Sequence, residues 1–294
     1  MPPHTSDTTA KMLRGGPIAA SIRSELGKPV TILRNQGLVP TLAVVVASDD
    51  GAVLAYAEAK QRSGAKLGIA LRLERLEAGS GQSDLEDLLD DLSADPSVHG
   101  ILLELPLADG LNAEAAIAKI DPRKDIDGMT AANLGLIAAG NEDAALAPAT
   151  PLACIRLAEE ATNIAGKRAV VIGRGRTVGR ALAPMLVNRN ATVTVCHTKT
   201  PDLAEAIAPC ELVFVAAGKA GLIGPHHLRE RQVVVDAGIN PAEGGIIGDV
   251  SPKAADIVAA LTPVPGGVGP LTSTLIFSNL LKAIGLQGKG DTSP

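Results

Sequence analysis

Short, continuous apolar runs alternate with helix-period stretches along most of the chain, the pattern of strand–helix–strand units built around parallel sheets. Residues 41–47 (TLAVVVA) and 100–105 (GILLEL) predict strands that are buried on both faces. Between them, residues 52–67 and 84–92 predict helices. The pattern therefore indicates an α/β protein.

The alternation is denser in the second half of the chain. Residues 168–172, 192–196, 212–215 and 233–236 predict four strands of one sheet, with a helix over RALAPMLVN between the first two. We expect this sheet to form a domain of its own, residues 151–270.

The boundary between the domains is expected near residues 148–151. In APATP, Thr150 is placed to cap a helix over about 151–164, and Pro151 suits the first position of that helix. The first domain then spans residues 1–150. We expect the last segment, residues 271–294, to pack back on it through a final helix over about 271–284.

Composition and charge exclude several classes of protein. The 294 residues include one Tyr, two Phe and no Trp, too few rings for a surface that stacks single-stranded nucleic acid. The net charge of −5 removes the usual electrostatic reason to expect a nucleic-acid partner. No apolar run approaches the roughly 18 residues that span a bilayer, and the polar N-terminus lacks the apolar core of a signal peptide. We expect a cytoplasmic protein that binds neither nucleic acid nor membrane.

The cysteine count supports the same location. Cys154, Cys196 and Cys210 are an odd number without metal-type spacing, which indicates a reducing compartment and no disulfide framework. The histidines show no ligand spacing either, so we expect no metal site.

A glycine loop follows the first strand of the second domain. Gly173, Gly175 and Gly179 lie between a strand and a helix, where phosphate can approach the backbone N–H groups at a helix N-terminus. The spacing G-x-G-x-x-x-G is one residue longer than the standard dinucleotide fingerprint. A glycine-rich turn without a ligand has the same pattern.

The end of the next strand bears on the cofactor. An NAD site usually places Asp or Glu there, whereas this chain has Cys-His-Thr-Lys-Thr over 196–200. Thr198 can donate to a phosphate, and Arg174 and Arg176 can supply positive charge. This pattern favours NADP, unless the arginines are only solvated loop charges.

Four residues of the first domain are candidates for chemistry. Tyr56 and Lys60 are four residues apart on a predicted helix and therefore share a face. They are either catalytic residues or a solvated pair on the helix surface. Glu104 ends a buried strand, so it belongs to a site or to a structural ion pair. Asp127, in KDIDG with Asp125, is a further candidate, although a simple Asx turn would explain both.

Together these segments resemble the bifunctional methylenetetrahydrofolate dehydrogenase/methenyltetrahydrofolate cyclohydrolase family over about residues 13–285. The matching stretches are DD-x-A-x-x-x-Y-x-x-x-K (residues 49–60), GILLELPL, KDIDG, PATP, GRGRTVG, ATVTVCHTKT, DAGIN, GDV and TPVPGGVGPLT. The last stretch, residues 262–272, is the most specific. The resemblance implies two α/β domains around a cleft, the C-terminal one a Rossmann-type parallel sheet, and a homodimer.

The resemblance also implies an activity and a set of site residues. Family members oxidise 5,10-methylenetetrahydrofolate with NADP and hydrate the methenyl product to 10-formyltetrahydrofolate. Tyr56 would stack on the folate, Lys60 would be the catalytic lysine assisted from position 104, and Asp127 would bind the pterin ring. Further folate-binding residues would be Leu103, Glu104, Leu105, Pro265, Gly266, Gly267, Val268 and Gly269. The cofactor would lie on Gly173, Arg174, Gly175, Arg176, Thr198, Ile239 and Thr150.

One departure from the family pattern bears directly on the chemistry. Glu104 stands where the family usually has Gln, and a carboxylate within about 4–6 Å of a lysine favours the ammonium form. A lysine needed as a neutral base would be handicapped, whereas hydride transfer depends mainly on positioning. We therefore hypothesise that the dehydrogenase step survives and the cyclohydrolase step is weakened. Alternatively, Glu104 is itself the base.

Smaller departures leave other functions open. Gly51, Val53, Leu136, Ala149 and Gly175 replace the Pro, Ser, Arg, Cys and Ser usual in the family. Because several of these lie on the substrate side, one alternative is a relative that acts on another one-carbon or pterin-like substrate. The other is a non-catalytic protein that binds NADP or folate, against which the retained Lys60 argues.

Overall fold

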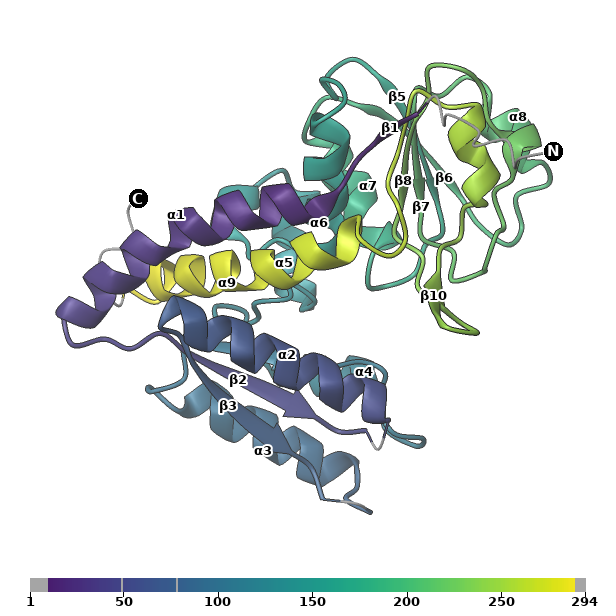
Figure 1. The fold of residues 1–294 in the computed structure, drawn as a ribbon. Helices are drawn as coiled ribbons and strands as arrows, with labels where there is room; N and C mark the ends of the chain where they lie inside the picture. Colours follow the sequence, from purple (N-terminus) through teal and green to yellow (C-terminus); the bar gives the residue numbers. More distant parts are fainter. Residues whose placement is uncertain (1–9, 49, 78, 289–294) are drawn as a thin grey trace. The chain divides into compact units, whose positions relative to one another are not determined.

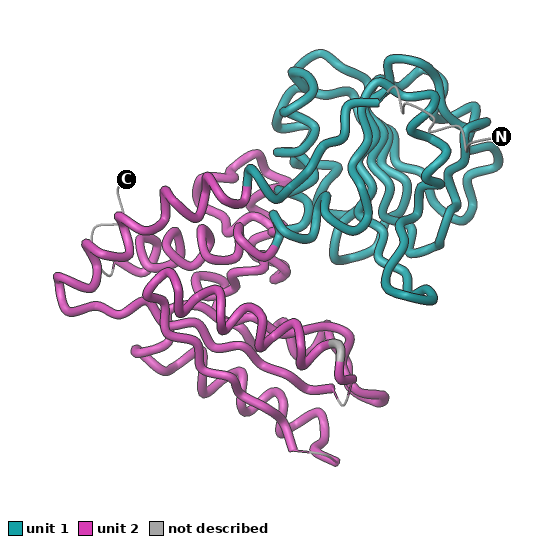
Figure 2. Tube along the Cα trace, in the orientation of Figure 1, with its two compact units in different colours: residues 1–18, 150–272 teal, residues 19–149, 273–294 magenta. Residues whose placement is uncertain are grey.

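The computed structural model describes residues 10–48, 50–77 and 79–288. Asp49 of the Tyr–Lys motif and the polar segment 1–9 lie outside the described residues. The chain divides into two compact units, unit 1 (Met1–Ile18, Thr150–Thr272) and unit 2 (Ala19–Ala149, Ser273–Pro294), coloured separately in Figure 2. The boundaries fall inside three helices, α1 (Gly15–Asn35), α6 (Ala149–Glu159) and α9 (Val268–Leu286).

Unit 2 contains a parallel sheet of three strands in the order β3 (Ala70–Arg75), β2 (Thr41–Val46), β4 (Gly100–Leu103). Strands β2 and β3 are labelled in Figure 1. Strands β2 and β4 confirm the two predicted apolar strands, although β4 ends two residues early. Strand β3 was not predicted, because its sequence ALRLER mixes apolar and charged residues.

Most of α1 precedes the strands of unit 2, and the other helices of the unit lie between and after them. The predicted helices are present as α2 (Gly51–Leu67) and α3 (Gln82–Ala94). The core contains side chains of β2, β4 and α3, among them Val45, Ile101 and Leu89. The remaining elements are α4 (Ala113–Ile117), α5 (Ala131–Ala138) and the 3₁₀ turn Glu142–Ala144.

The C-terminal part of α9 belongs to unit 2 and is held there by a buried amide. Asn279 donates its two side-chain N–H groups to the backbone oxygens of Ile126 (2.7 Å) and Ala147 (2.8 Å). These bonds satisfy carbonyl groups that would otherwise be buried without a partner, which costs about 1–3 kcal/mol each.

Unit 1 contains a parallel sheet of six strands. Their order is β1 (Lys11–Met12), β11 (Ala260–Leu261), β8 (Val233–Asp236), β7 (Leu212–Val215), β5 (Arg168–Ile172), β6 (Thr192–Cys196). The four long strands confirm the predicted ones with the same bounds. The two-residue strands β1 and β11 were not predicted, since two residues carry no periodic signal.

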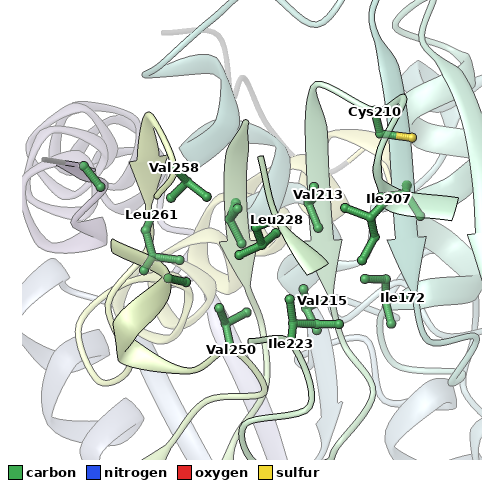
Figure 3. Close-up of a cluster of buried hydrophobic side chains, with 14 of the residues drawn as sticks. Ile172, Ile207, Cys210, Val213, Val215, Ile223, Leu228, Val250, Val258 and Leu261 are labelled. Atoms are coloured by element: carbon green, nitrogen blue, oxygen red, sulfur yellow. The ribbon is translucent and has the colours of Figure 1, made fainter. Parts of the chain in front are cut away.

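One core cluster of unit 1 consists of aliphatic side chains and two cysteines. Figure 3 shows Val213, Val215 and Ile172 of the sheet beside Ile207, Leu228 and other side chains of the flanking segments. The connecting elements are α7 (Gly179–Val187), α8 (Leu203–Ile207), the 3₁₀ turns Pro225–His227 and Pro252–Asp256, and the hairpin β9 (Asn240–Ala242) with β10 (Gly245–Ile247). All three cysteines are buried and unpaired.

Helix α6 corrects one expectation. It begins at Ala149 rather than after Thr150, and it ends at Glu159 rather than near residue 164. Thr150 is therefore inside the first turn and is not the N-cap. Pro151 is still tolerated there, because the first N–H groups of a helix have no intrahelical partner.

Within the part of the chain that the structure describes, no helix is both long and apolar enough to cross a membrane.

Candidate active site

Lys60 and Glu104 form a close ion pair in unit 2. Lys60 lies on α2, and Glu104 follows β4, where its N–H still donates to the Val45 oxygen of β2 (2.9 Å). The Lys60 Nζ is 2.6 Å from the Glu104 Oε1, and the two side chains are only 11% and 10% exposed. Lys60 is therefore not part of a solvated helix face, and Glu104 neutralises a nearly buried ammonium group.

Tyr56 presents its ring to solvent one helical turn before Lys60. The residue is 51% exposed, and the Lys60 Nζ is 5.8 Å from the ring centroid, within the range of a cation–π interaction. An exposed ring beside a buried ion pair offers a flat apolar surface to a planar ligand. This is the only tyrosine of the chain.

Asp125 and Asp127 have different roles in the segment after α4, which pairs with β4 at Ile101. The carboxylate of Asp125 accepts hydrogen bonds from the N–H groups of Met129 (3.0 Å) and Thr130 (2.7 Å) and from the Asn133 side chain (3.0 Å). Asp125 therefore fixes the turn that follows it, although through N–H groups four and five residues on rather than the N–H two residues on that defines an Asx turn. Gly128 is required there, because its φ is +64° and a Cβ would collide with the backbone around Leu146.

Asp127, unlike Asp125, does not hold the turn together. Burial raises the pKa of Asp127 to about 7, and the negative charges of Asp125 and Glu104 act in the same direction. The Lys60 ammonium and a hydrogen bond from the Ala149 backbone oppose that rise. Lys60, Glu104 and Asp127 are therefore one electrostatic group, which we call the lysine–carboxylate cluster.

The two leucines that flank Glu104 differ in exposure. Leu103 is 7% exposed and packs in the core of unit 2, so it can offer a ligand little besides its backbone. Leu105 is partly exposed.

The Pro/Gly segment that carries the other predicted folate-binding residues lies in unit 1. Pro265 is exposed, and Gly266 has a φ of +107°. The Gly267 N–H donates to the Pro263 oxygen (2.8 Å), and Val268 and Gly269 begin α9. The segment is thus a tight turn that leads into a helix.

The glycine loop connects β5 to α7 as predicted. Packing requires two of its three glycines and leaves the third unexplained. A Cβ on Gly173 would collide with the Ala216 carbonyl group, and one on Gly179 would collide with the Gly173 carbonyl group. Gly175 has open space around it and is exposed, so protein packing does not require it. Its backbone is accessible to a ligand, which favours the phosphate-binding interpretation over a purely structural turn.

Further predicted cofactor residues lie at the carboxyl ends of strands in the same sheet. Thr198 is exposed in a turn after β6 that is closed by a hydrogen bond from the His197 N–H to the Thr200 Oγ1 (2.9 Å). Arg174 is exposed on the glycine loop, and Arg176 is partly buried. Ile239, after β8, is 59% exposed, which is unusual for a large apolar side chain. Thr150 is partly buried on α6.

Sequence reasoning missed two buried acids at this edge of the sheet. Asp236 and Asp249 lie in DAGIN and GDV, motifs that contribute to the resemblance but were given no role. They are 2% and 0% exposed. A signal was present, because an acid directly after the apolar run VVV is costly to bury without donors.

Two family models match the chain. The family model described as "tetrahydrofolate dehydrogenase/cyclohydrolase, catalytic domain" matches residues 13–127. The model described as "tetrahydrofolate dehydrogenase/cyclohydrolase, NAD(P)-binding domain" matches residues 148–287. Among curated proteins, the "bifunctional protein FolD" of Heliobacterium modesticaldum is 46% identical over 283 residues, which are 95% of this chain and 98% of that protein.

Two solved structures have the same fold. The bifunctional enzyme FolD, a methylenetetrahydrofolate dehydrogenase/cyclohydrolase from Campylobacter jejuni, has a TM-score of 0.91 at 36% identity, and the match covers 96% of this chain and all of that one. The methylenetetrahydrofolate dehydrogenase-cyclohydrolase (FolD) of Trypanosoma brucei, complexed with NADP cofactor and inhibitor, has a TM-score of 0.89 at 31% identity, with 96% and 99% covered.

The raised pKa of Asp127 predicts a pH-dependent stability. Between its ordinary value of 3.8 and about 7, the folded protein holds a proton at Asp127 that the unfolded chain has released. The free energy of unfolding therefore falls as the pH rises through this window. The difference in free energy of unfolding between Asp127→Asn and the wild type, measured by urea unfolding, should favour the variant by about 1–3 kcal/mol more at pH 8 than at pH 5.

A matched control is Asp109→Asn, which makes the same change on an exposed loop and should shift stability equally at both pH values. An Asp127→Asn effect that is the same at pH 5 and pH 8 would contradict the prediction.

Proposed function

Because the chain belongs to the tetrahydrofolate dehydrogenase/cyclohydrolase family, we propose that it oxidises 5,10-methylenetetrahydrofolate to the 5,10-methenyl form with NADP. The reaction moves a hydride from the folate methylene carbon to the nicotinamide ring. The observation that carries the proposal is the lysine–carboxylate cluster beside an exposed Tyr56, in the part of the chain that matches the family's catalytic domain.

The choice of NADP is supported by the carboxyl end of β6 and by a relative. Residues 197–201, directly after β6, include no acid to bind a ribose diol, while Thr198 and Arg174 are exposed and able to bind a phosphate. The Trypanosoma brucei relative was solved with NADP. The accessible backbone at Gly175 fits a pyrophosphate.

The residues of unit 2 suggest a division of roles for the folate. Tyr56 offers a ring face to the pterin, and the Asp127 carboxylate can accept hydrogen bonds from its N–H groups. Lys60 places a positive charge at the carboxyl end of the sheet, where open α/β sheets bind ligands. The roles that the resemblance gives to Leu103, Leu105 and residues 265–269 stay predictions.

A direct assay tests the dehydrogenase. Purified protein given methylenetetrahydrofolate and NADP should form NADPH, followed by its absorbance, with kcat/KM for NADP about tenfold or more above that for NAD. Absence of NADPH and NADH formation would contradict the proposed activity, and a preference for NAD would contradict only the choice of cofactor.

The Lys60–Glu104 contact bears on the second activity, hydrolysis of the methenyl product. A base must remove a proton from the attacking water, and a lysine can do so only when it is neutral. Here the Lys60 Nζ lies 2.6 Å from a nearly buried carboxylate, so its ammonium group is held in an ion pair that must break before the amine can act as a base. We therefore propose that Glu104 weakens the cyclohydrolase step and leaves hydride transfer largely intact.

Glu104→Gln tests this idea. We expect the variant to hydrolyse methenyltetrahydrofolate about tenfold faster than the wild type, while its NADPH formation stays within about threefold. A matched control is Glu74→Gln, which removes a partly exposed acid paired with Arg72 and should change neither rate.

Two outcomes would contradict the proposal. A wild-type protein that hydrolyses the methenyl compound as fast as it forms NADPH would show that Glu104 is no handicap. Slower hydrolysis by Glu104→Gln would identify Glu104 as the base, with Lys60 as its fixed cation.

We also propose that the protein is a cytoplasmic homodimer. Strand β3 (Ala70–Arg75) is an edge strand that pairs only with β2 among the described residues, so it leaves a row of backbone groups for a second copy. Sedimentation velocity should show a dimer at micromolar concentration, and a monomer at all concentrations would contradict this. Cell fractionation tests the location.

A further inference from the structure

Asp249 is a fully buried carboxylate that binds the loop after β7. Its Oδ2 accepts hydrogen bonds from the N–H groups of Ala217 (2.6 Å) and Gly218 (2.8 Å), and its Oδ1 accepts one from Lys219 (2.8 Å). Three successive N–H groups that converge on one point form a nest, a geometry that binds anions such as phosphate. Here the protein supplies the anion itself, so this loop is closed to a phosphate group.

The same carboxylate also holds the hairpin that follows Ile239. The Asn240 Nδ2 donates to the Asp249 Oδ1 (2.9 Å) and to the Ile247 oxygen (3.2 Å), so one side chain ties both hairpin strands to Asp249. Asp249 thus receives four hydrogen bonds from two separate loops.

Asp236 holds the other side of Ile239. Its Oδ1 accepts from the N–H groups of Gly238 (2.9 Å) and Asp249 (3.1 Å), and its Oδ2 accepts from the Val250 N–H (2.9 Å). Cβ atoms on Gly238 and Gly248 would collide with the carboxyl groups of Asp249 and Asp236, respectively. The two acids therefore fix the residues on either side of Ile239, and the close packing at Gly238 and Gly248 leaves no space for a larger side chain.

This network lies next to the glycine loop. The Ala216 N–H donates to the Ile172 oxygen at the end of β5 (2.8 Å), and Gly173 is a glycine because the Ala216 carbonyl group leaves no room for a Cβ. The loops after β5, β7 and β8 therefore form one edge, the carboxyl edge at which open α/β sheets bind ligands.

We propose that Asp249, with Asp236 and Asn240, is a positioning residue for the dinucleotide. These side chains fix loop 216–219 and the exposed Ile239 in the shape that receives the cofactor, before it binds. The inference rests on the proposed use of NADP. It assigns the phosphate contacts to the glycine loop and to the β6 turn. Loop 216–219 then serves as a preformed surface against which the cofactor packs.

Asp249→Asn tests the proposal. The amide has nearly the same size but only one accepting oxygen, so two of the four hydrogen bonds are lost. We expect the Kd for NADP, measured by calorimetric titration of the whole chain, to rise about tenfold or more. The KM for methylenetetrahydrofolate should stay within about twofold, whereas a merely structural role would lower the binding stoichiometry and the melting temperature and leave the Kd for NADP unchanged.

The matched control is Glu211→Gln, at the opposite end of β7. Its carboxylate accepts from the Arg168 N–H (3.3 Å) and from Lys167 (2.7 Å), so the substitution also removes acceptors from a backbone N–H, and it should leave NADP binding unchanged.

A second variant keeps the proposal falsifiable if Asp249→Asn does not fold. Asn240→Ala removes the hairpin contact from a partly buried position, and it should raise the Kd for NADP about threefold or more. A wild-type Kd in a folded variant of either position overturns the positioning role. Failure of the wild-type protein to bind NADP would instead overturn the proposed function.

Discussion

Parallel strands end in backbone N–H groups that the sheet cannot satisfy, and this protein satisfies them with buried aspartates. Asp125, which pairs with Ile101 of β4, binds the turn that follows it in unit 2, and Asp249 and Asp236 bind the loops after β7 and β8 in unit 1. A buried donor without a partner costs about 1–3 kcal/mol. The loops at both carboxyl edges are therefore held in place by the fold itself, and the candidate sites are built on them.

The acids assigned to chemistry differ from these in their partners. The side chain of Glu104 is bound by a lysine, and Asp127, beside Asp125, is held by the Ala149 backbone. Burial, together with the negative charge of Asp125, raises the pKa of Asp127 to about 7, so its protonation changes near neutral pH. In the same way, Gly173 and Gly179 serve packing while Gly175 is left accessible.

Prediction from the sequence succeeded where a segment is buried on both faces. The strands at 168–172, 212–215 and 233–236 were predicted with their observed bounds, because a continuous apolar run ends where the chain leaves the sheet. Prediction also succeeded for the edge strand at 192–196, which is largely exposed, because its Thr and Val residues favour strands. It failed for β3, whose arginines and glutamate interrupt the apolar pattern. It failed also at Thr150, since the start of a helix depends on one or two residues.

The amino-acid sequence by itself determined the α/β class, the glycine loop and the identity of the side chains that can do chemistry, since these follow from local periodicity and residue type. Only the tertiary structure decided which of them meet. Lys60 and Glu104 are 44 residues apart, and Asp249 lies 30 to 32 residues from the N–H groups that it binds. Such contacts depend on which strands become neighbours in the sheet, and burial of the whole core, rather than any local pattern, selects that order.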